Sequence, residues 1–348
     1  MNNKKRILIA PLDWGLGHAS RCIPIARQLE KHGFDVVFAA SGRPLDLLMG
    51  ELPNRDFIKL DGYDIHYPKN GNMAWSMIRQ SLKIWKGIRK ENKALKQIVE
   101  DFAIDGVISD NRFGMYSKKV PSVFVTHQLH IQSPILRQWI QNVNFKYIEK
   151  YDACWIPDTE EHLLSANLTK GQLPQVDCHF IGGLSRFEPL EKTDELDILA
   201  VISGPEPQRT LFENILKQQL LASKKKALLV LGKTEDHSEQ HIENLKIVGH
   251  LKSEELNQAM VNATVVISRS GYSTVMDLAK LNKKAIFVPT PGQTEQLYLA
   301  KYYYDKQLTF AMPQHSFDLA IALEKMKDFK GLNLSEQQTP WDKLIALF

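Results

Sequence analysis

Short apolar runs alternate along most of the chain with stretches in which apolar residues recur at helical spacing. The runs 7–10 and 35–40 lack polar alternation, as is typical of parallel strands that are buried on both faces. Between them, apolar residues from Cys22 to Leu29 follow the helical period, and Gly33 is placed to end that helix in a left-handed conformation. The pattern predicts a strand–helix–strand unit with a right-handed crossover in a parallel sheet.

The same pattern continues in two series that are separated by a break. The first series predicts further strands at 106–109, 122–126, 153–156 and 179–182. After a charged, proline-containing stretch, the second series predicts strands at 198–202, 227–231, 247–249, 264–267 and 285–288. Two such series indicate an α/β fold with two doubly wound, Rossmann-like domains that face each other across a cleft.

Two features set the expected domain boundaries, namely the charged, proline-containing stretch between the two series and the apolar stripe of the C-terminal segment. We predict a first domain at 1–184, a linker at 185–196 and a second domain at 197–333. The segment 334–348 is expected to form a helix that packs back on the first domain. In that helix, Thr339 would be the N-cap and Pro340 the first helical residue.

Composition and charge exclude several classes of protein. The 348 residues are 43% apolar and 24% charged, which is typical of soluble globular domains and not of disordered or fibrous chains. The three cysteines form no C-x-x-C pair, so neither a disulfide framework nor a zinc site is indicated, and a cytoplasmic location is expected. No apolar stretch is long enough to span a membrane. The net charge of +4 is too small to indicate a nucleic-acid-binding protein.

The glycine-rich turn after the first strand is a candidate site. Gly15, Gly17 and Ser20 form an incomplete dinucleotide fingerprint, and the second strand does not end in an acid, so NAD binding is disfavoured. Such a turn still directs the N–H groups of a helix N-terminus at an anion or a hydroxyl. His18 lies at this helix start, where the helix dipole favours a neutral imidazole. We therefore interpret His18 as a candidate general base, with Asp13 as an alternative base or orienting partner. A histidine that only caps the turn is the structural alternative.

Two segments resemble a known class of enzymes. The segment 15–21, Gly-Leu-Gly-His-Ala-Ser-Arg, resembles the N-terminal signature of the two-domain GT-B glycosyltransferases. The segment 268–277, Ser-Arg-Ser-Gly-Tyr-Ser-Thr-Val-Met-Asp, is similar to the donor-binding region of glycosyltransferase family 28, and so are the motifs that follow it at 287–289 and 293–296. The best-known activity of that family adds N-acetylglucosamine to a lipid-linked muramyl acceptor. The resemblance implies a UDP-sugar as donor substrate and no separate cofactor.

The resemblance also implies a set of donor-binding residues in the second half of the chain. A loop that ends a strand and opens a helix suits a nucleotide diphosphate. Asp277 would accept hydrogen bonds from the ribose hydroxyls, and Glu295 stands where the family has a glutamine, which leaves the donor sugar open because a carboxylate only accepts. The expected donor-binding residues are Ser203, Gly204, His250, Leu251, Arg269, Ser270, Gly271, Tyr272, Ser273, Thr274, Asp277, Gln293, Glu295 and Gln296.

Residues after strand ends in the first half are candidates for the acceptor site, because doubly wound sheets bind ligands at the carboxyl ends of their strands. These candidates are Gly15, Gly17, Asp110, Arg112, His127 and Gln128, and the alternative is that they tie loops together. The family inverts the anomeric centre by direct displacement, while a base takes a proton from the acceptor hydroxyl. The chain has no Asp-x-Asp motif, so a metal-independent reaction is expected.

A basic stripe distinguishes the segment between Tyr63 and Phe102. Its residues are spaced by four, three, four and three positions and are Arg79, Lys83, Lys86, Lys90 and Lys93. One interpretation is a solvated face of an amphipathic helix. The other is docking to an anionic membrane surface, which would place the enzyme peripherally on the inner face of the cytoplasmic membrane. A nucleic-acid groove is disfavoured.

The sequence therefore predicts an inverting, metal-independent glycosyltransferase. It would move a sugar from a UDP-sugar to a hydroxyl acceptor, with a lipid-linked or cell-envelope glycan as the acceptor that the family resemblance favours. Two alternatives use the same fold, namely a nucleotide-sugar epimerase and a UDP-sugar hydrolase. A third is a non-catalytic UDP-sugar-binding subunit.

Overall fold

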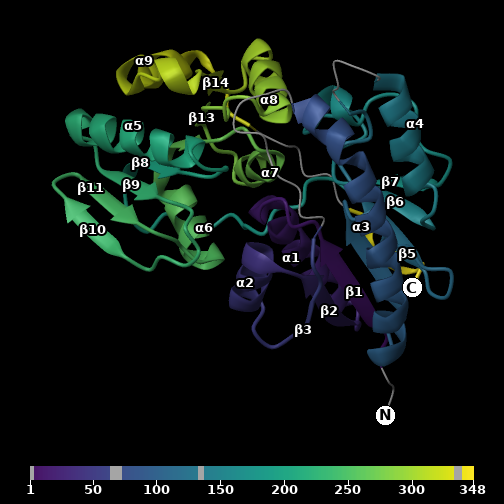
Figure 1. The fold of residues 1–348 in the computed structure, drawn as a ribbon. Helices are drawn as coiled ribbons and strands as arrows, with labels where there is room; N and C mark the ends of the chain where they lie inside the picture. Colours follow the sequence, from purple (N-terminus) through teal and green to yellow (C-terminus); the bar gives the residue numbers. More distant parts are fainter. Residues whose placement is uncertain (1–3, 63–72, 132–136, 333–338) are drawn as a thin grey trace. The chain divides into compact units, whose positions relative to one another are not determined.

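The chain forms two compact α/β units (Figure 1). The computed structural model describes residues 4–62, 73–131, 137–332 and 339–348, without the side chains of 73–82. Unit 1 comprises Met1–Leu184 and Gln337–Phe348, and unit 2 comprises Ser185–Glu336. The first boundary follows Leu184, where the sequence places the end of the first domain, whereas the expected linker 185–196 lies within unit 2.

Unit 1 is built on a parallel sheet. Within the described residues this sheet has seven strands in the order β3-β2-β1-β4-β5-β6-β7. The strands are β1 (Arg6–Pro11), β2 (Asp35–Ala40), β3 (Asp56–Lys59), β4 (Gly106–Asp110), β5 (Ser122–Val125), β6 (Ala153–Ile156) and β7 (Asp177–Phe180). The apolar runs form strands because both faces of the sheet are covered, and β4, β5 and β6 are buried along their whole length.

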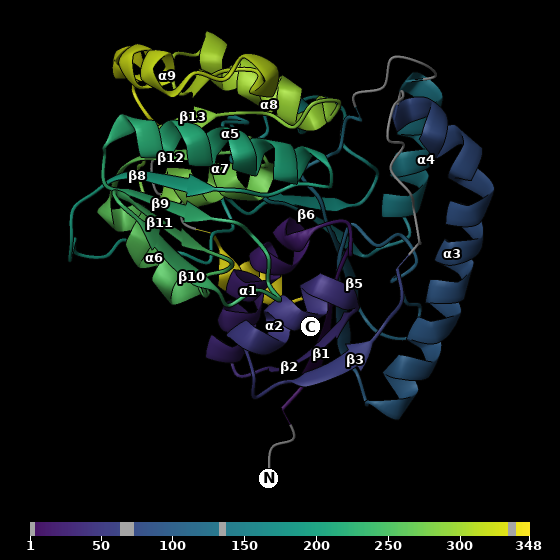
Figure 2. The same cartoon turned by 60° about the vertical axis from the view of Figure 1, so that its left-hand side comes forward.

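Helices cover the faces of this sheet (Figure 2). They are α1 (Leu16–Lys31), α2 (Gly42–Glu51), α3 (Met73–Asp101), α4 (Arg137–Ile148), the 3₁₀ turn η1 (Ala166–Leu168) and α10 (Trp341–Ile345). Leu95 and Ile98 of α3 pack with Leu8 of β1 in the core of one face. Gly33 follows the end of α1 with a φ of 88°, so the predicted left-handed residue is confirmed.

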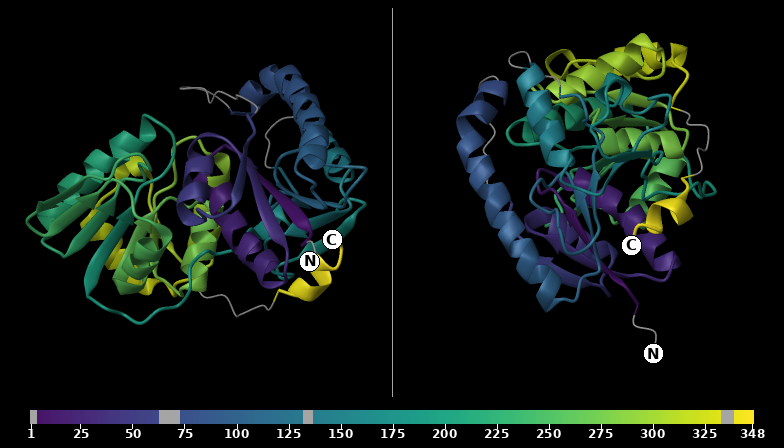
Figure 3. Two further views of the ribbon diagram at one scale, coloured as in Figure 1. Left: turned by 90° about the horizontal axis from the view of Figure 1, so that it is seen from below. Right: turned by 90° about the vertical axis from the view of Figure 1, so that its right-hand side faces the viewer.

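The C-terminal segment belongs to unit 1 (Figure 3). The Trp155 ring of β6 meets Trp341 and Phe348 edge to face, and Lys5 Nζ donates a hydrogen bond of 2.5 Å to the Phe348 carbonyl oxygen. The predicted N-cap was wrong by one position, because Pro340 is the N-cap and the helix begins at Trp341. The Thr339 hydroxyl instead donates to a backbone carbonyl after β7, so it anchors the segment to the sheet.

Unit 2 repeats the doubly wound plan with a sheet in the order β10-β11-β9-β8-β12-β13-β14. Its strands are β8 (Leu196–Val201), β9 (Ala227–Val230), β10 (Glu239–Ile242), β11 (Leu245–Val248), β12 (Ala263–Ser268), β13 (Ala285–Phe287) and β14 (Phe310–Ala311). Its helical elements are α5 (Gln208–Ser223), α6 (Ser253–Asn262), α7 (Tyr272–Lys280), α8 (Thr294–Asp305), η2 (Gln314–Ser316), α9 (Leu319–Lys325) and η3 (Met326–Asp328). Only β10 runs antiparallel to its neighbour among the described strands. No described helix has the length and apolarity needed to cross a membrane.

Candidate active site

The candidate catalytic residues of unit 1 lie where the strand order of its sheet reverses. β1 and β4 pair side by side, with Pro11 opposite Asp110 at their carboxyl ends. From β1 the next strands, β2 and β3, are added on one side, whereas from β4 the next strands are added on the other side. The carboxyl ends of β1 and β4 therefore form the topological switch point at which such folds bind ligands. The chain leaves β1 through Gly15, whose φ of 142° disfavours a side chain, and enters α1 without a side-chain cap. His18 therefore stands in the first turn of α1, directly above the strand ends.

Asp110 is held as a buried carboxylate by Arg21. The Arg21 guanidinium donates to both carboxylate oxygens through Nε and Nη2, and the Arg21 and Asp110 side chains are 2% and 0% exposed, respectively. The Cys22 thiol also approaches Asp110 Oδ2, at 3.8 Å. Burial alone would raise the pKa of Asp110, but the charge of Arg21 and the hydrogen bonds from Arg21 and His18 outweigh it and lower the pKa to about 2. Asp110 is thus an anion at every physiological pH.

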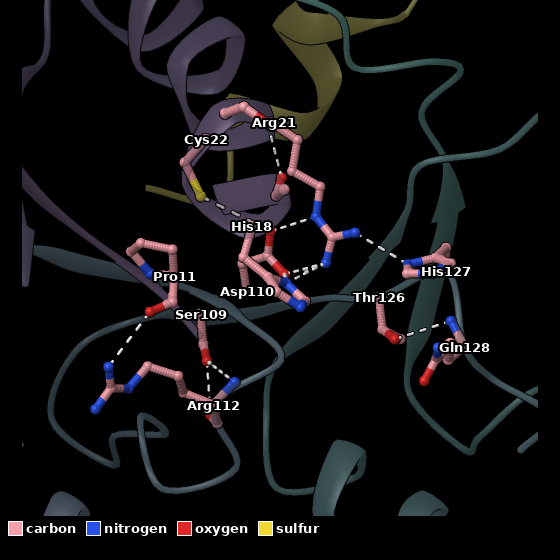
Figure 4. A network of polar contacts seen from close by, with 12 residues as sticks. Pro11, His18, Arg21, Cys22, Ser109, Asp110, Arg112, Thr126, His127 and Gln128 are labelled. Carbon is pink, nitrogen blue, oxygen red and sulfur yellow. Dashed lines mark hydrogen bonds and ion pairs between the residues drawn. The ribbon is translucent and has the colours of Figure 1, made fainter. Parts of the chain in front are cut away.

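This carboxylate orients His18 (Figure 4). His18 Nδ1 lies 2.8 Å from Asp110 Oδ1 and also 2.8 Å from Arg21 Nη2. A ring nitrogen carries either a hydrogen or a lone pair, and the adjacent anion favours the hydrogen, so we assign Nδ1–H donating to Asp110. Nε2 then keeps the lone pair. The side chain is 18% exposed, so His18 has the form and the access that a general base needs.

His127 is the second imidazole on the same arginine. It follows β5, it is buried, and its Nδ1 lies 2.9 Å from Arg21 Nη1. The next residue, Gln128, is half-buried and donates its backbone N–H to the Thr126 hydroxyl. Arg21 therefore joins the carboxyl ends of β4 and β5 to the first turns of α1.

The structure corrects the role expected of Arg112. Its side chain is completely buried and pairs with Glu91 of α3, with Nε 2.5 Å from Oε1. It also donates to the carbonyl oxygens of Pro11 and Asp61. Arg112 therefore ties the end of β1 and the loop after β3 to α3, and it does not line an acceptor site. Asp110 is likewise wholly buried, so it orients His18 and does not contact an acceptor.

Asp13 lies in the loop after β1 and packs against the backbone of Gly62, where any side chain would collide with its carboxylate. Within the described residues, its Oδ1 is buried without a hydrogen-bond partner. The orienting carboxylate of His18 is Asp110, so the alternative that assigned this role to Asp13 was wrong. Of the two glycines expected at the acceptor, Gly15 is exposed and Gly17 half-buried.

Unit 2 carries its own candidate site at the equivalent switch point, between β8 and β12. The exposed loop after β8 begins with Ser203 and with Gly204, whose φ is 106°. The loop after β12 opens α7 through Gly271, which provides no side-chain cap. The Ser268 hydroxyl at the end of β12 is buried without a hydrogen-bond partner among the described residues. The uncapped backbone N–H groups at the N-terminus of α7 are therefore the candidate anion-binding donors at this edge.

The structure also corrects the role expected of Arg269. Its side chain is 1% exposed and donates to the Val288 carbonyl at 2.9 Å and to Gln314 Oε1 at 2.7 Å. Its guanidinium stacks over Phe212, and burial lowers its pKa to about 10. Arg269 thus links the loop after β13 to Gln314 and to Phe212 of α5, and its side chain is not available to contact a diphosphate in this arrangement.

Other predicted donor residues shape the loops around that edge. Gln296 Oε1 accepts the Thr290 N–H at 2.8 Å, and Ser270 Oγ donates to the Gln296 carbonyl at 2.7 Å. Asp277 is bonded to Ser185 Oγ at 2.6 Å, and burial raises its pKa to about 6 against the opposing effects of Arg186 and Ser185. Tyr272 is buried, whereas the remaining candidates are half-buried, namely His250, Leu251, Ser273, Thr274, Gln293 and Glu295.

The basic stripe of α3 faces solvent over its described part. Lys83, Lys86, Lys90 and Lys93 are all exposed, and Arg79 lies outside the described side chains. Trp85 on the same helix is 42% exposed, with the Arg89 guanidinium 3.5 Å above its ring. The acid of this stretch, Glu91, points inward to its buried partner and does not reduce the charge of the surface. We call the exposed side chains of Lys83, Trp85, Lys86, Lys90 and Lys93 the basic face.

Three functional contacts were missed by sequence reasoning. Arg21 belongs to the motif 15–21 and lies one helical turn after His18 on the apolar side of α1, and that position is a usable signal of a contact between the two side chains. Glu91 and Ser185 gave no such signal, because their partners are distant in sequence.

The chain is similar in sequence and in fold to known glycosyltransferases. The glycosyltransferase family 28 C-terminal domain matches residues 198–339, which is nearly all of unit 2. The chain is a family 28-like glycosyltransferase. An uncharacterized glycosyltransferase of Methanosarcina mazei is 23% identical to it over 88% of this chain and 86% of that one.

Two further proteins extend the glycosyltransferase likeness over both units. The UDP-N-acetylglucosamine--N-acetylmuramyl-(pentapeptide) pyrophosphoryl-undecaprenol N-acetylglucosamine transferase of Pasteurella multocida is 22% identical over 89% of this chain and 85% of its own. The structure of the spinosyn rhamnosyltransferase SpnG complexed with thymidine diphosphate has a TM-score of 0.62 at 11% identity and covers 98% of this chain and 95% of that one. The predicted GT-B architecture of two Rossmann-like domains is confirmed.

Proposed function

We propose that this glycosyltransferase moves a sugar from a UDP-sugar to an acceptor hydroxyl with inversion at the anomeric carbon. The observation that carries the proposal is the pairing of His18 with the buried Asp110 carboxylate. It leaves His18 Nε2 with a lone pair at an accessible position above the strand ends. That nitrogen takes the proton of the acceptor hydroxyl as the oxygen attacks the anomeric carbon and the nucleotide diphosphate leaves. A single displacement of this kind inverts the configuration.

The donor is proposed to bind to unit 2. The N-terminus of α7 supplies backbone hydrogen-bond donors for the diphosphate, so the charge of the leaving group is stabilised without a metal ion or cofactor. The relative from Pasteurella multocida is named for a UDP-sugar, whereas the SpnG structure is of a complex with thymidine diphosphate. The resemblance of 268–296 to family 28 favours the uridine nucleotide.

The acceptor is proposed to be lipid-linked, and the basic face to dock the enzyme on an anionic membrane surface. The name of the relative from Pasteurella multocida specifies a pyrophosphoryl-undecaprenol acceptor. In this chain, four exposed lysines flank an exposed tryptophan on one helix of unit 1. Lysines attract anionic headgroups, and an indole ring partitions into the headgroup region. The enzyme would then act on the inner face of the cytoplasmic membrane.

The catalytic proposal is tested with His18→Ala. Turnover should fall by about 100-fold or more, because general base catalysis contributes about 10²–10⁴-fold. Donor binding, measured as the thermal shift produced by a panel of UDP-sugars and dTDP-sugars, should survive in the variant, because His18 lies in unit 1. Unchanged turnover removes His18 from the mechanism. Release of free UDP without an acceptor would identify a hydrolase, and loss of the anomeric inversion in the product would refute direct displacement.

The membrane proposal is tested with vesicles that contain phosphatidylglycerol. The variant Lys83→Glu/Lys86→Glu should lose binding at low salt, whereas Lys224→Glu/Lys225→Glu, which makes the same charge change on exposed residues of unit 2, should retain it. Equal binding by both variants, or no binding by the unaltered protein, contradicts the proposal.

A further inference from the structure

Arg21 contacts two histidines through two different nitrogens. A guanidinium has hydrogen-bond donors and no acceptor, so the ring nitrogen opposite Arg21 Nη1 must accept. That nitrogen is His127 Nδ1, at 2.9 Å. The hydrogen of a neutral His127 is therefore on Nε2. His18 Nδ1 lies 2.8 Å from the Asp110 Oδ1 acceptor and 2.8 Å from the Arg21 Nη2 donor. Because Arg21 Nη2 already donates to Asp110 Oδ1, we assign the hydrogen of His18 to Nδ1, where the carboxylate accepts it. One buried arginine–aspartate pair thus selects opposite tautomers in the two imidazoles.

We propose that His127 is a positioning residue that acts through Arg21 and Asp110 to hold His18 in its basic tautomer, and that it performs this role only while it is neutral. The importance of this role for catalysis rests on the proposed function, but the assignment of the tautomers does not. The sequence reasoning expected His127 to bind the acceptor. The contact with Arg21 assigns it a different task.

His127 can act on His18 through Arg21 because all three nitrogens of the Arg21 guanidinium make hydrogen bonds. Nε and Nη2 are directed at Asp110, and His127 takes the remaining side of the group through Nη1. Because Arg21 is 2% exposed, water cannot replace a lost acceptor without rearrangement, and an unsatisfied buried donor is costly. With three nitrogens fixed, the guanidinium plane cannot rotate. The Asp110 carboxylate is then locked in the orientation that receives His18 Nδ1–H.

Protonation of His127 would undo this arrangement. An imidazolium cannot accept from Arg21, and it would place a second positive charge against the guanidinium. The charged and titratable groups that the described contacts link to His127 through Arg21 come from two elements. Arg21, His18 and Cys22 belong to α1, and Asp110 ends β4. Only Asp110 is negative, and its two oxygens already accept from Arg21.

The tautomers can be measured directly in the unliganded protein. Long-range ¹H–¹⁵N spectra of protein labelled at histidine nitrogens distinguish a protonated ring nitrogen from one with a lone pair. At about pH 8, well above the usual histidine pKa of about 6.5, His127 should show the lone pair on Nδ1 and His18 should show it on Nε2. His127→Gln and His18→Gln assign the signals, and His179→Gln, on the edge strand β7, should leave both unchanged. A protonated Nδ1 in His127 overturns the proposal.

Two substitutions at His127 test the coupling. Leucine removes the acceptor, whereas the amide oxygen of glutamine can still accept from Arg21 Nη1. In His127→Leu the Nδ1–H tautomer of His18 should lose population, and kcat should fall by about 10-fold or more with the donor KM unchanged, as expected for a mispositioned catalytic group. His127→Gln should restore most of both.

Several results would overturn the coupling. One is His18 nitrogen shifts in His127→Leu that match those of the unaltered protein, and another is equal losses of kcat in the leucine and glutamine variants. Should His127→Leu not fold, the spectra of the unaltered protein and of His127→Gln still decide the matter. The spectra need no substrate, so a protein with the predicted tautomers but no glycosyl transfer would refute the proposed function and leave the tautomer assignment standing.

Discussion

Replacement of Asp110 by asparagine tests both the stability and the chemistry of the candidate site. In the unaltered protein the pKa of Asp110 is lowered from 3.8 to about 2. A carboxyl group with a lowered pKa stabilises the folded state above its unfolded pKa, and that contribution is lost as the pH falls through the folded pKa. The shift is equivalent to about 2 kcal/mol at neutral pH, of which about half is lost by pH 3.

Asp110→Asn changes this balance in a defined way. Near pH 6 the variant keeps the buried Arg21 charge but has lost its counter-ion, which should cost about 3–5 kcal/mol. The asparagine has no pKa in this range, so its free energy of unfolding lacks the acid-dependent contribution of Asp110. The difference between the two proteins should therefore shrink by about 1 kcal/mol between pH 6 and pH 3. Turnover should fall by about 100-fold or more, because a neutral amide no longer selects the Nδ1–H tautomer of His18.

The chain itself provides the assay. All six tryptophans lie in residues assigned to unit 1, at positions 14, 75, 85, 139, 155 and 341. Tryptophan fluorescence during urea unfolding therefore follows the unit that contains Asp110 and is blind to unit 2. Asp46→Asn, which alters an exposed carboxyl on α2, serves as the control. A difference for Asp110→Asn that stays constant from pH 6 to pH 3, or a variant as stable as the unaltered protein, would refute the electrostatic reasoning.

Substitutions at three further places test other parts of the structure. Gly106→Ala places a methyl group 2.4 Å from the Phe348 ring, so unit 1 should lose about 1–3 kcal/mol by urea unfolding, and a change below the measurement error contradicts the packing. Arg112→Met removes the positive charge that pairs with the buried Glu91 carboxylate and should destabilise unit 1 by about 3–5 kcal/mol, whereas adding Glu91→Leu should recover most of the loss. Asp277 has its pKa raised to about 6, so it opposes folding increasingly as the pH rises from about 4 through 6. Asp277→Asn should slow hydrogen exchange in unit 2 at pH 8 but not at pH 4, and equal exchange at pH 8 would contradict the raised pKa.

The sequence predicted the strands that are buried along most of their length, whereas β10 and β3, which it missed, are exposed or half-buried. β1, β2 and β6 are apolar because helices cover both sides of the sheet, and the residue pattern alone reveals that. β10 is exposed at all four positions and carries polar residues, as an edge strand does, so it has no apolar signal. β3 was missed for a related reason, since none of its residues is fully buried.

The site was predictable as a location and less so as a set of contacts. His18 follows from the glycine turn, and Asp110 follows from its place at a strand end. Their connection depends on Arg21, which is 89 residues from Asp110 in the chain, and spacing carries no information about such a pair. The acceptor-binding role expected of Arg112 was wrong for the same reason, because its partner is distant in sequence. An arginine after a strand end looks like a ligand contact until the fold brings Glu91 to it.

The return of the C-terminal segment to unit 1 has a consequence for how the protein is made. Residues 339–348 leave the ribosome only after the whole of unit 2 has been synthesised. Until then, the Trp155 ring and the backbone around Gly106 lack the cover that Trp341 and Phe348 later provide. Unit 2, which is continuous in sequence, has all of its residues available earlier. A nascent chain stalled anywhere in unit 2 would therefore display an uncovered aromatic surface on unit 1, which is the kind of surface that chaperones and proteases recognise in unfinished proteins.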